Sequence, residues 1–196
     1  MSDPTSSPTS SPTSSPAGSR VTTPYEGRGH RAWDPSAVIE APLHLHDTPA
    51  LAEWMDYNGH MSESCYLLAF GDSADAFFRY IGIDEAYRAA GHSLYTSETH
   101  LHHRAEAAEG EPLVMTLQVL DLDRRRLHIF HEMRHGDTGQ LLASAEQLLV
   151  HVDMGAGRSS EMPDELYERV AAIQQAHAAL PQPEVVGRPL GIRRHT

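Results

Sequence analysis

The stretch Tyr66–Tyr80, with the sequence YLLAFGDSADAFFRY, decides the fold that this chain is expected to adopt. Its apolar residues recur at helical spacing, and Gly82 follows as a natural helix end. The apolar side chains cover much of the helix circumference, which leaves no broad face for water. The pattern therefore predicts a helix that other structure wraps, and not one that lies on a surface.

The segments on both sides of this helix have the alternating pattern of β-strands. Ala41–Thr48 precedes the helix, with leucine and histidine alternating. Four further runs follow it, separated by short turn sequences: Ser93–His103, Pro112–Leu122, Arg126–His135 and Gln140–Asp153. Short separators make consecutive strands antiparallel neighbours. One antiparallel sheet must then curl around one long central helix, which is the α+β arrangement called the hotdog fold.

The two ends of the chain differ from this central part. A Pro-Thr-Ser-Ser repeat fills residues 3–16, and it has no apolar side chain that could offset the entropy of ordering. We therefore expect residues 1–36 to form a disordered tail and residues 37–196 to form the domain. Near the C-terminus, Pro163–Leu180 predicts a second, more polar helix, which an extended surface segment follows.

Composition excludes several classes of function. The 196-residue chain has a formal net charge of −12, which argues against nucleic-acid and membrane-surface partners but allows a local basic patch. Its 15 basic residues are all arginine, so no lysine can form a Schiff base. A single cysteine, Cys65, allows no intramolecular disulfide, and the chain has no long apolar run and no signal-like N-terminus. These features predict a soluble, cytoplasmic protein.

The loop before the helix, Trp54–Met61 (WMDYNGHM), carries the side chains that could take part in a reaction. Asp56 lies on an Asn-Gly turn, and His60 and the free amides of a helix start are close to it in sequence. Such an arrangement can activate a water and hold a developing negative charge. The alternative is that Asp56 only caps the turn, while Asn58 and Gly59 supply its backbone geometry.

The Asp56–Met61 motif resembles the signature of hotdog acyl-CoA thioesterases of the 4-hydroxybenzoyl-CoA thioesterase class. Further segments resemble one branch of that class, the betainyl-CoA thioesterases of carnitine breakdown, which occur alone or fused to carnitine dehydrogenase. These segments are Phe70–Asp75, Leu94–His100, Leu127–His135, Ala145–Gln147 and His177–Ile192. Together with the motif they span about Glu40–Ile192. Ser62 departs from the class, in which asparagine is common at this position.

The resemblance implies an acyl-CoA thioester hydrolase, with betainyl-CoA as its substrate and glycine betaine and coenzyme A as products. It implies no metal or redox cofactor, and a homodimer or a tetramer of dimers. In the class, the acid at the position of Asp56 acts as a base on water or as a nucleophile. His60 would orient water or contact the substrate, and the alternative is a loop histidine with satisfied hydrogen bonds. Cys65 is an alternative nucleophile, but it lacks a cationic neighbour that would activate its thiol, and a small buried helix residue is the other interpretation.

Recognition of a cationic acyl group would need a carboxylate and aromatic faces. Glu98 is the candidate acid, since a carboxylate in mid-strand is unusual unless it is exposed or functional. Strand alternation would place Glu98 on one face with Thr96, His100 and His102. Together with Asn58 and Gly59, the expected substrate-binding residues include three aromatics, for each of which core packing is the alternative: Trp54, Tyr57 and Tyr95.

Two further groups have open interpretations. The turn formed by Arg124, Arg125 and Arg126 could hold the phosphates of coenzyme A or could simply be solvated. The paired histidines along two strands do not complete a zinc ligand set, so we predict no metal site. The alternatives to a specific hydrolase are a general thioesterase for small acyl-CoAs and a non-catalytic hotdog protein that binds acyl-CoA.

Overall fold

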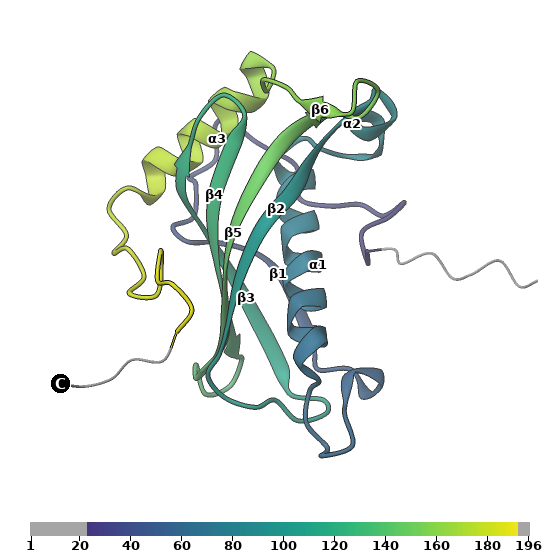
Figure 1. The fold of residues 1–196 in the computed structure, drawn as a ribbon, viewed down its shortest axis with the longest axis vertical. Coiled ribbons are helices and arrows are strands. Elements are labelled where there is room, and N and C mark those ends of the chain that lie inside the picture. The colour runs from purple at the N-terminus through teal and green to yellow at the C-terminus, as the bar shows by residue number, and fades with distance from the viewer. Residues whose placement is uncertain (1–22, 192–196) are drawn as a thin grey trace, which may run out of the picture.

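The computed structural model describes residues 23–191. Its main elements are one long helix, a second helix near the C-terminus and five long strands, in the order β1 (Leu43–Pro49), α1 (Glu63–Ile81), β2 (His92–His103), β3 (Pro112–Leu122), β4 (Arg126–His135), β5 (Leu141–Asp153) and α3 (Asp164–His177). Three short elements complete it: η1 (Ala52–Trp54), α2 (Glu85–Ala89) and β6 (Arg158–Ser159). The sheet has the antiparallel order β1-β3-β4-β5-β2, with β6 added to β5. It curls around α1, so the predicted hotdog arrangement is confirmed (Figure 1).

Helix α1 ends where the sequence predicts and begins earlier. Gly82 terminates it with a φ of +100°, in the left-handed region that favours glycine. The helix starts at Glu63 and not at Tyr66, because Ser62 opens a first turn whose side chains are mostly polar. That turn carries little of the apolar spacing by which the rest of the helix is recognised.

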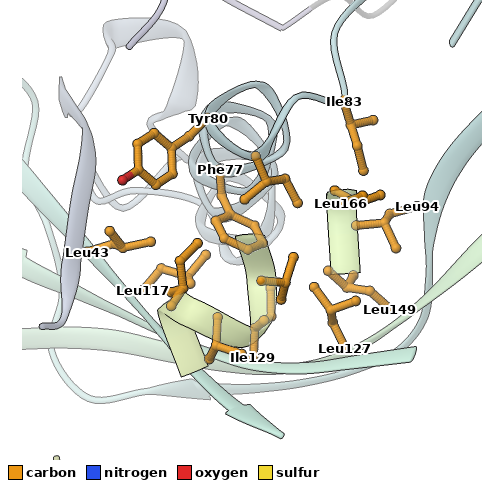
Figure 2. Close-up of a cluster of buried hydrophobic side chains, with 14 of the residues drawn as sticks. Leu43, Phe77, Tyr80, Ile83, Leu94, Leu117, Leu127, Ile129, Leu149 and Leu166 are labelled. Carbon is orange, nitrogen blue, oxygen red and sulfur yellow. The ribbon is translucent and has the colours of Figure 1, made fainter. Parts of the chain in front are cut away.

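The core fills the space between α1 and the sheet. Phe77 is fully buried and points from α1 towards the curved sheet, where Leu117, Ile129 and Leu149 meet it (Figure 2). Side chains of this size each stabilise the fold by about 1.5–3 kcal/mol when they leave water. The helix that the apolar pattern predicts therefore supplies one side of the core. Its other side is not fully wrapped by residues 23–191, since Leu67 is 44% and Leu68 41% exposed.

Helix α3 closes one end of this core. It packs against β3 and against the C-terminal end of α1, where Arg169 donates to the carbonyl of Ile81 at 3.0 Å. His177 joins two further segments: its Nδ1 accepts the N–H of Val119 at 2.9 Å, and its Nε2 lies 2.9 Å from the carbonyl oxygen of Glu40. Burial lowers the pKa of His177. The helix thus ties β3, α1 and the segment before β1 together.

A charged network covers the outer side of the C-terminal half of α1. The Arg79 side chain is fully buried and binds three carboxylates: Asp75 at 2.8 Å, Glu85 at 2.6 Å and Glu26 at 3.2 Å. One turn before Asp75, burial and the nearby charge of Asp75 raise the pKa of Asp72 to about 6. The buried Arg79 guanidinium is therefore matched by carboxylates on three different segments of the chain.

Residues 23–36 contact the domain, although we expected them to belong to the tail. The Tyr25 hydroxyl lies 2.5 Å from Nδ1 of His46, and Trp33 packs edge-on against Tyr80 with ring centroids 5.5 Å apart. The division of the chain at residue 36 remains a prediction, and residues 1–22 lie outside the described part. None of the helices within residues 23–191 has the length and apolarity that crossing a membrane requires.

Strand β2 contains a bulge that corrects one prediction. Thr96 lies opposite Leu149, whereas Glu98 lies opposite Leu148, so Ser97 is an extra residue in the ladder. Adjacent residues of β5 point to opposite faces, and Thr96 and Glu98 must therefore do so too. The prediction that alternation places both on one face is wrong. The Ser97 hydroxyl donates to the carbonyl of Leu148 at 2.9 Å.

Candidate active site

The turn Asp56–His60 is closed at both of its ends. The Asp56 N–H donates to the carbonyl of His60 at 2.8 Å, and Met55 and Met61 form an antiparallel bridge just outside it. Gly59 has a φ of +78°, which a side chain would strain. The Asn-Gly sequence therefore does provide the turn geometry, and the turn holds Asp56 beside His60.

The carboxylate of Asp56 is fixed over this turn. Its Oδ1 accepts the backbone N–H of Asn58 at 2.7 Å, and its Oδ2 lies 3.4 Å from the Asn58 amide nitrogen. The side chain is half-buried. A carboxylate oxygen can accept more than one hydrogen bond, so Asp56 retains acceptor capacity for a water or a substrate.

The turn leads directly into the start of α1. Ser62 is the N-cap, and its side chain makes no capping hydrogen bond, while its N–H donates to the carbonyl of Trp54 at 2.8 Å. The first amides of a helix lack partners within the helix and form the positive end of its dipole. A carboxylate and a set of donors suited to an oxyanion therefore lie next to one another.

A second loop, residues 104–110, lies against the turn. The Met61 N–H donates to the carbonyl of Ala107 at 2.8 Å, and His60 forms a bridge with Ala108. This contact brings Glu106 close to the turn, with its Oε2 3.4 Å from Nε2 of His60. Glu106 cannot be recognised from the sequence alone, because it is remote in the chain from the motif and carries no signal of its own.

The three candidate aromatics have different surroundings. Tyr57, on the turn, is 97% exposed, and Tyr95, on β2, is 53% exposed. Trp54 is only 6% exposed and belongs to a core cluster with Met61 and Phe70. The structure thus favours the packing alternative for Trp54, while Tyr57 has a free ring at the turn.

Glu98 lies on the face of the sheet opposite α1. Its neighbour across the strands, Leu148, alternates with Leu149, which is fully buried against the helix. Glu98 pairs with His100 at 2.9 Å. Both line a cavity of about 400 Å³ with further ionisable side chains, namely Asp121, Asp123, Arg126, His128 and Glu146. Within one chain, the structure does not bring Glu98 to Asp56.

The arginine turn is also remote from Asp56 within one chain. Each of its arginines binds a carboxylate: Arg124 binds Asp164 at 2.6 Å, Arg125 binds Glu161 at 3.1 Å and Arg126 binds Asp123 at 2.5 Å. Asp164 opens α3, which packs at the C-terminal end of α1. The 19-residue helix separates that end from the Asp56 turn by about 28 Å.

Metal ligation receives no support from the described side chains. Residues 23–191 contain no group of three or more histidine, cysteine, aspartate or glutamate side chains placed to hold a metal ion. Cys65 is a free, half-buried cysteine in the first turn of α1. The turn therefore offers carboxylate, imidazole and amide chemistry.

The sequence profile of the thioesterase-like superfamily matches residues 50–170, which include the Asp56 turn, α1 and strands β2–β5. The chain belongs to the thioesterase-like superfamily. The match confirms the family that the motif indicated.

Two relatives within this superfamily carry more specific names. A betainyl-CoA thioesterase of Pseudomonas aeruginosa is 45% identical over 151 residues, which are 76% of this chain and 95% of that protein. An L-carnitine dehydrogenase/betainyl-CoA thioesterase of Rhizobium meliloti is 44% identical over 170 residues, 84% of this chain and 34% of that protein. The chain thus spans about a third of the length of this fused relative.

Solved structures of the thioesterase-like type share the fold. A protein of Pseudomonas putida that is thought to be a thioesterase superimposes with a TM-score of 0.69 at 28% identity, over 78% of this chain and 98% of that one. A Staphylococcus aureus protein, solved in complex with CoA, superimposes with a TM-score of 0.73 over 80% of this chain and all of that one. At 24% identity, the second likeness concerns the fold alone.

Proposed function

We propose that this member of the thioesterase-like superfamily hydrolyses betainyl-CoA to glycine betaine and coenzyme A. One observation carries the choice of acyl group: the 45% identity to the Pseudomonas aeruginosa betainyl-CoA thioesterase extends over 95% of that protein. The fused Rhizobium relative carries the same activity in its name, although this chain covers only 34% of that protein. The alternative is a general thioesterase for small acyl-CoAs.

Asp56 is the residue to which we assign the chemistry. In one route, its carboxylate removes a proton from a water whose oxygen bonds to the thioester carbon. In the other, the carboxylate attacks that carbon itself and forms an anhydride, which water then cleaves. In both routes the carbon–sulfur bond breaks, the thiolate of coenzyme A leaves and is protonated, and the acyl group ends as a carboxylate.

The neighbours of Asp56 supply the remaining parts of the reaction. The amides that open α1 would hold the carbonyl oxygen as it gains negative charge. His60, next to Asp56 across the closed turn, would orient the water or the substrate. A thiolate leaves readily, so the route needs no strong general acid, and we propose no metal or redox cofactor. Coenzyme A enters only as part of the substrate.

We also propose that the protein acts as a homodimer or as a tetramer of dimers. Strand β2 is a 12-residue edge strand that pairs with β5 along one side. In the described part of the chain, no strand pairs with its other side. A long unpaired edge can accept the same strand of a second copy. Size-exclusion chromatography with light scattering tests this assembly.

The function itself is tested by a panel of purified acyl-CoAs with detection of the released thiol. We expect kcat/KM to be highest for betainyl-CoA and clearly lower for acetyl-CoA and butyryl-CoA. Equal values for the three would reduce the activity to that of a general thioesterase. A folded protein that binds them without releasing thiol would be a non-catalytic binding protein.

A further inference from the structure

The chemistry of the proposed substrate limits where its cationic group can be recognised. In a betainyl thioester, one methylene joins the quaternary nitrogen to the carbonyl carbon, so the two atoms are about 2.5 Å apart. The group that attacks the carbonyl and the group that attracts the cation must therefore belong to one cluster. This inference rests on the proposed function, and it asks which second carboxylate accompanies Asp56.

We propose that Glu106 is the residue that discriminates in favour of the cationic acyl group. Its Oε2 lies 3.4 Å from Nε2 of His60, and the carbonyl of His60 accepts the N–H of Asp56 at 2.8 Å. His60 thus contacts both acidic residues, Glu106 through its ring and Asp56 through its backbone. In contrast, Glu98 lies on the face of the sheet away from α1 and pairs with His100.

The backbone around Glu106 is held firmly, although it belongs to a loop. The hydroxyl of Tyr66, on α1, donates to the carbonyl of Ala105 at 3.3 Å and accepts the N–H of Ala107 at 3.1 Å. Ala107 in turn accepts the N–H of Met61 at 2.8 Å. Glu106 therefore projects from a short arc of chain that is fixed to the helix at both of its ends.

The side chain of Glu106 remains available to a ligand. It is 76% exposed, in contrast to the Asp75 side chain beside Arg79, which is only 9% exposed. A quaternary ammonium group has no N–H to donate, so charge attraction and aromatic faces are what can recognise it. The neighbouring turn presents the Tyr57 ring, which is 97% exposed. Glu106 and Tyr57 thus provide both kinds of contact beside Asp56.

The test compares betainyl-CoA with its neutral isostere, 3,3-dimethylbutanoyl-CoA, in which a carbon replaces the charged nitrogen. We expect Glu106→Gln to lower kcat/KM for betainyl-CoA about three- to fivefold, the upper part of the range for an exposed ion pair. The value for the isostere should stay within about twofold. The matched control is Glu109→Gln, an exposed glutamate of the same loop, which should leave both values unchanged.

Ionic strength gives a second measurement on the same proteins. Salt screens exposed charges, so the preference of the wild type for betainyl-CoA over the isostere should fall as salt rises. The Glu106→Gln variant should show a smaller preference that hardly depends on salt. A preference with the same salt dependence in both proteins would overturn the assignment.

Other outcomes separate this inference from the proposed function. Equal losses on the two substrates in Glu106→Gln would show a structural role and overturn the inference. So would a selective loss on betainyl-CoA in Glu98→Gln that is absent in Glu106→Gln. A wild-type protein that does not hydrolyse betainyl-CoA would refute the proposed function itself. The wild type is therefore measured before any variant.

Discussion

The two ends of α1 use the same kinds of side chain for different purposes. At the C-terminal end, the buried Arg79 side chain binds Asp75, Glu85 and Glu26, so the carboxylates there are paired with a cation. At the N-terminal end, Asp56 is partly exposed and Glu106 is mostly exposed, with a histidine close to both, and no arginine of residues 23–191 forms an ion pair with either. Matched charges stabilise one end, while unmatched carboxylates leave the other ready to receive a cation. This difference between the two ends of α1 can be tested by substituting residues at each end separately.

The largest effect is expected at the N-terminal end, from Asp56→Asn. The substitution removes the proposed base or nucleophile, and kcat should fall by about 100-fold or more. Asparagine can still accept the N–H of Asn58, so the turn and the unfolding midpoint should change little. Thiol release from betainyl-CoA measures the activity, and circular dichroism confirms the fold.

The matched control for Asp56→Asn is Asp137→Asn, an exposed aspartate in the turn between β4 and β5. It should retain wild-type activity. Full activity in a folded Asp56→Asn protein would contradict the catalytic assignment and with it the difference between the two ends.

The next effect is expected at the C-terminal end, from Arg79→Met. Removal of the guanidinium leaves Asp75 buried without its main partner, which should lower the free energy of unfolding by about 3 kcal/mol. Urea denaturation measures this loss. Below the unfolding transition, kcat/KM per folded molecule should remain that of the wild type, because the site lies at the other end of the helix.

Arg158→Met, which removes an exposed arginine from β6, should have no such effect on stability. A loss of kcat/KM in fully folded Arg79→Met would show that the two ends are coupled. An Arg79→Met protein as stable as the wild type would show that the enclosed network does not stabilise the fold.

The smallest effect concerns Asp72, whose pKa is raised from 3.8 to about 6 by burial and by Asp75. The folded state holds this proton more tightly than the unfolded state, so the associated stability is complete below pH 3.8 and is lost as the pH rises through about 6. Asp72→Asn should therefore raise stability at pH 7.5 by about 1 kcal/mol, after allowance for solvent screening. Unfolding at pH 4 and at pH 7.5 should show the gain only at the higher pH.

Most of the fold could be predicted because each long element has a regular apolar pattern. Strands β3 and β4 begin and end at the predicted residues, since Asp123 defines the turn between them by accepting the N–H groups of Arg125 and Arg126 at 2.8 Å. Helix α2 cannot be predicted from the pattern, because none of its residues is buried and it has no apolar spacing. The bulge at Ser97 is likewise invisible in the sequence, because one extra residue in a ladder leaves no mark in composition.

The site was predictable only where it is local in sequence. Asp56, Asn58, Gly59 and His60 are consecutive or nearly so, and the turn that they predict is present. Glu106 reaches the turn only because α1 and β2 run in opposite directions and return the chain to its starting point (Figure 1). The exposure of Tyr57 and the burial of Trp54 likewise depend on packing, which neighbouring positions in a motif cannot reveal.

The contact made by His177 restricts which sequences can carry the C-terminal helix. Its Nδ1 accepts from Val119, so the ring must be neutral with its hydrogen on Nε2 in order to donate to the carbonyl of Glu40. Lysine and arginine can only donate, and alanine can do neither, whereas asparagine and glutamine carry both functions. Position 177 should thus accept amide side chains in a redesigned or evolving chain and reject permanent cations.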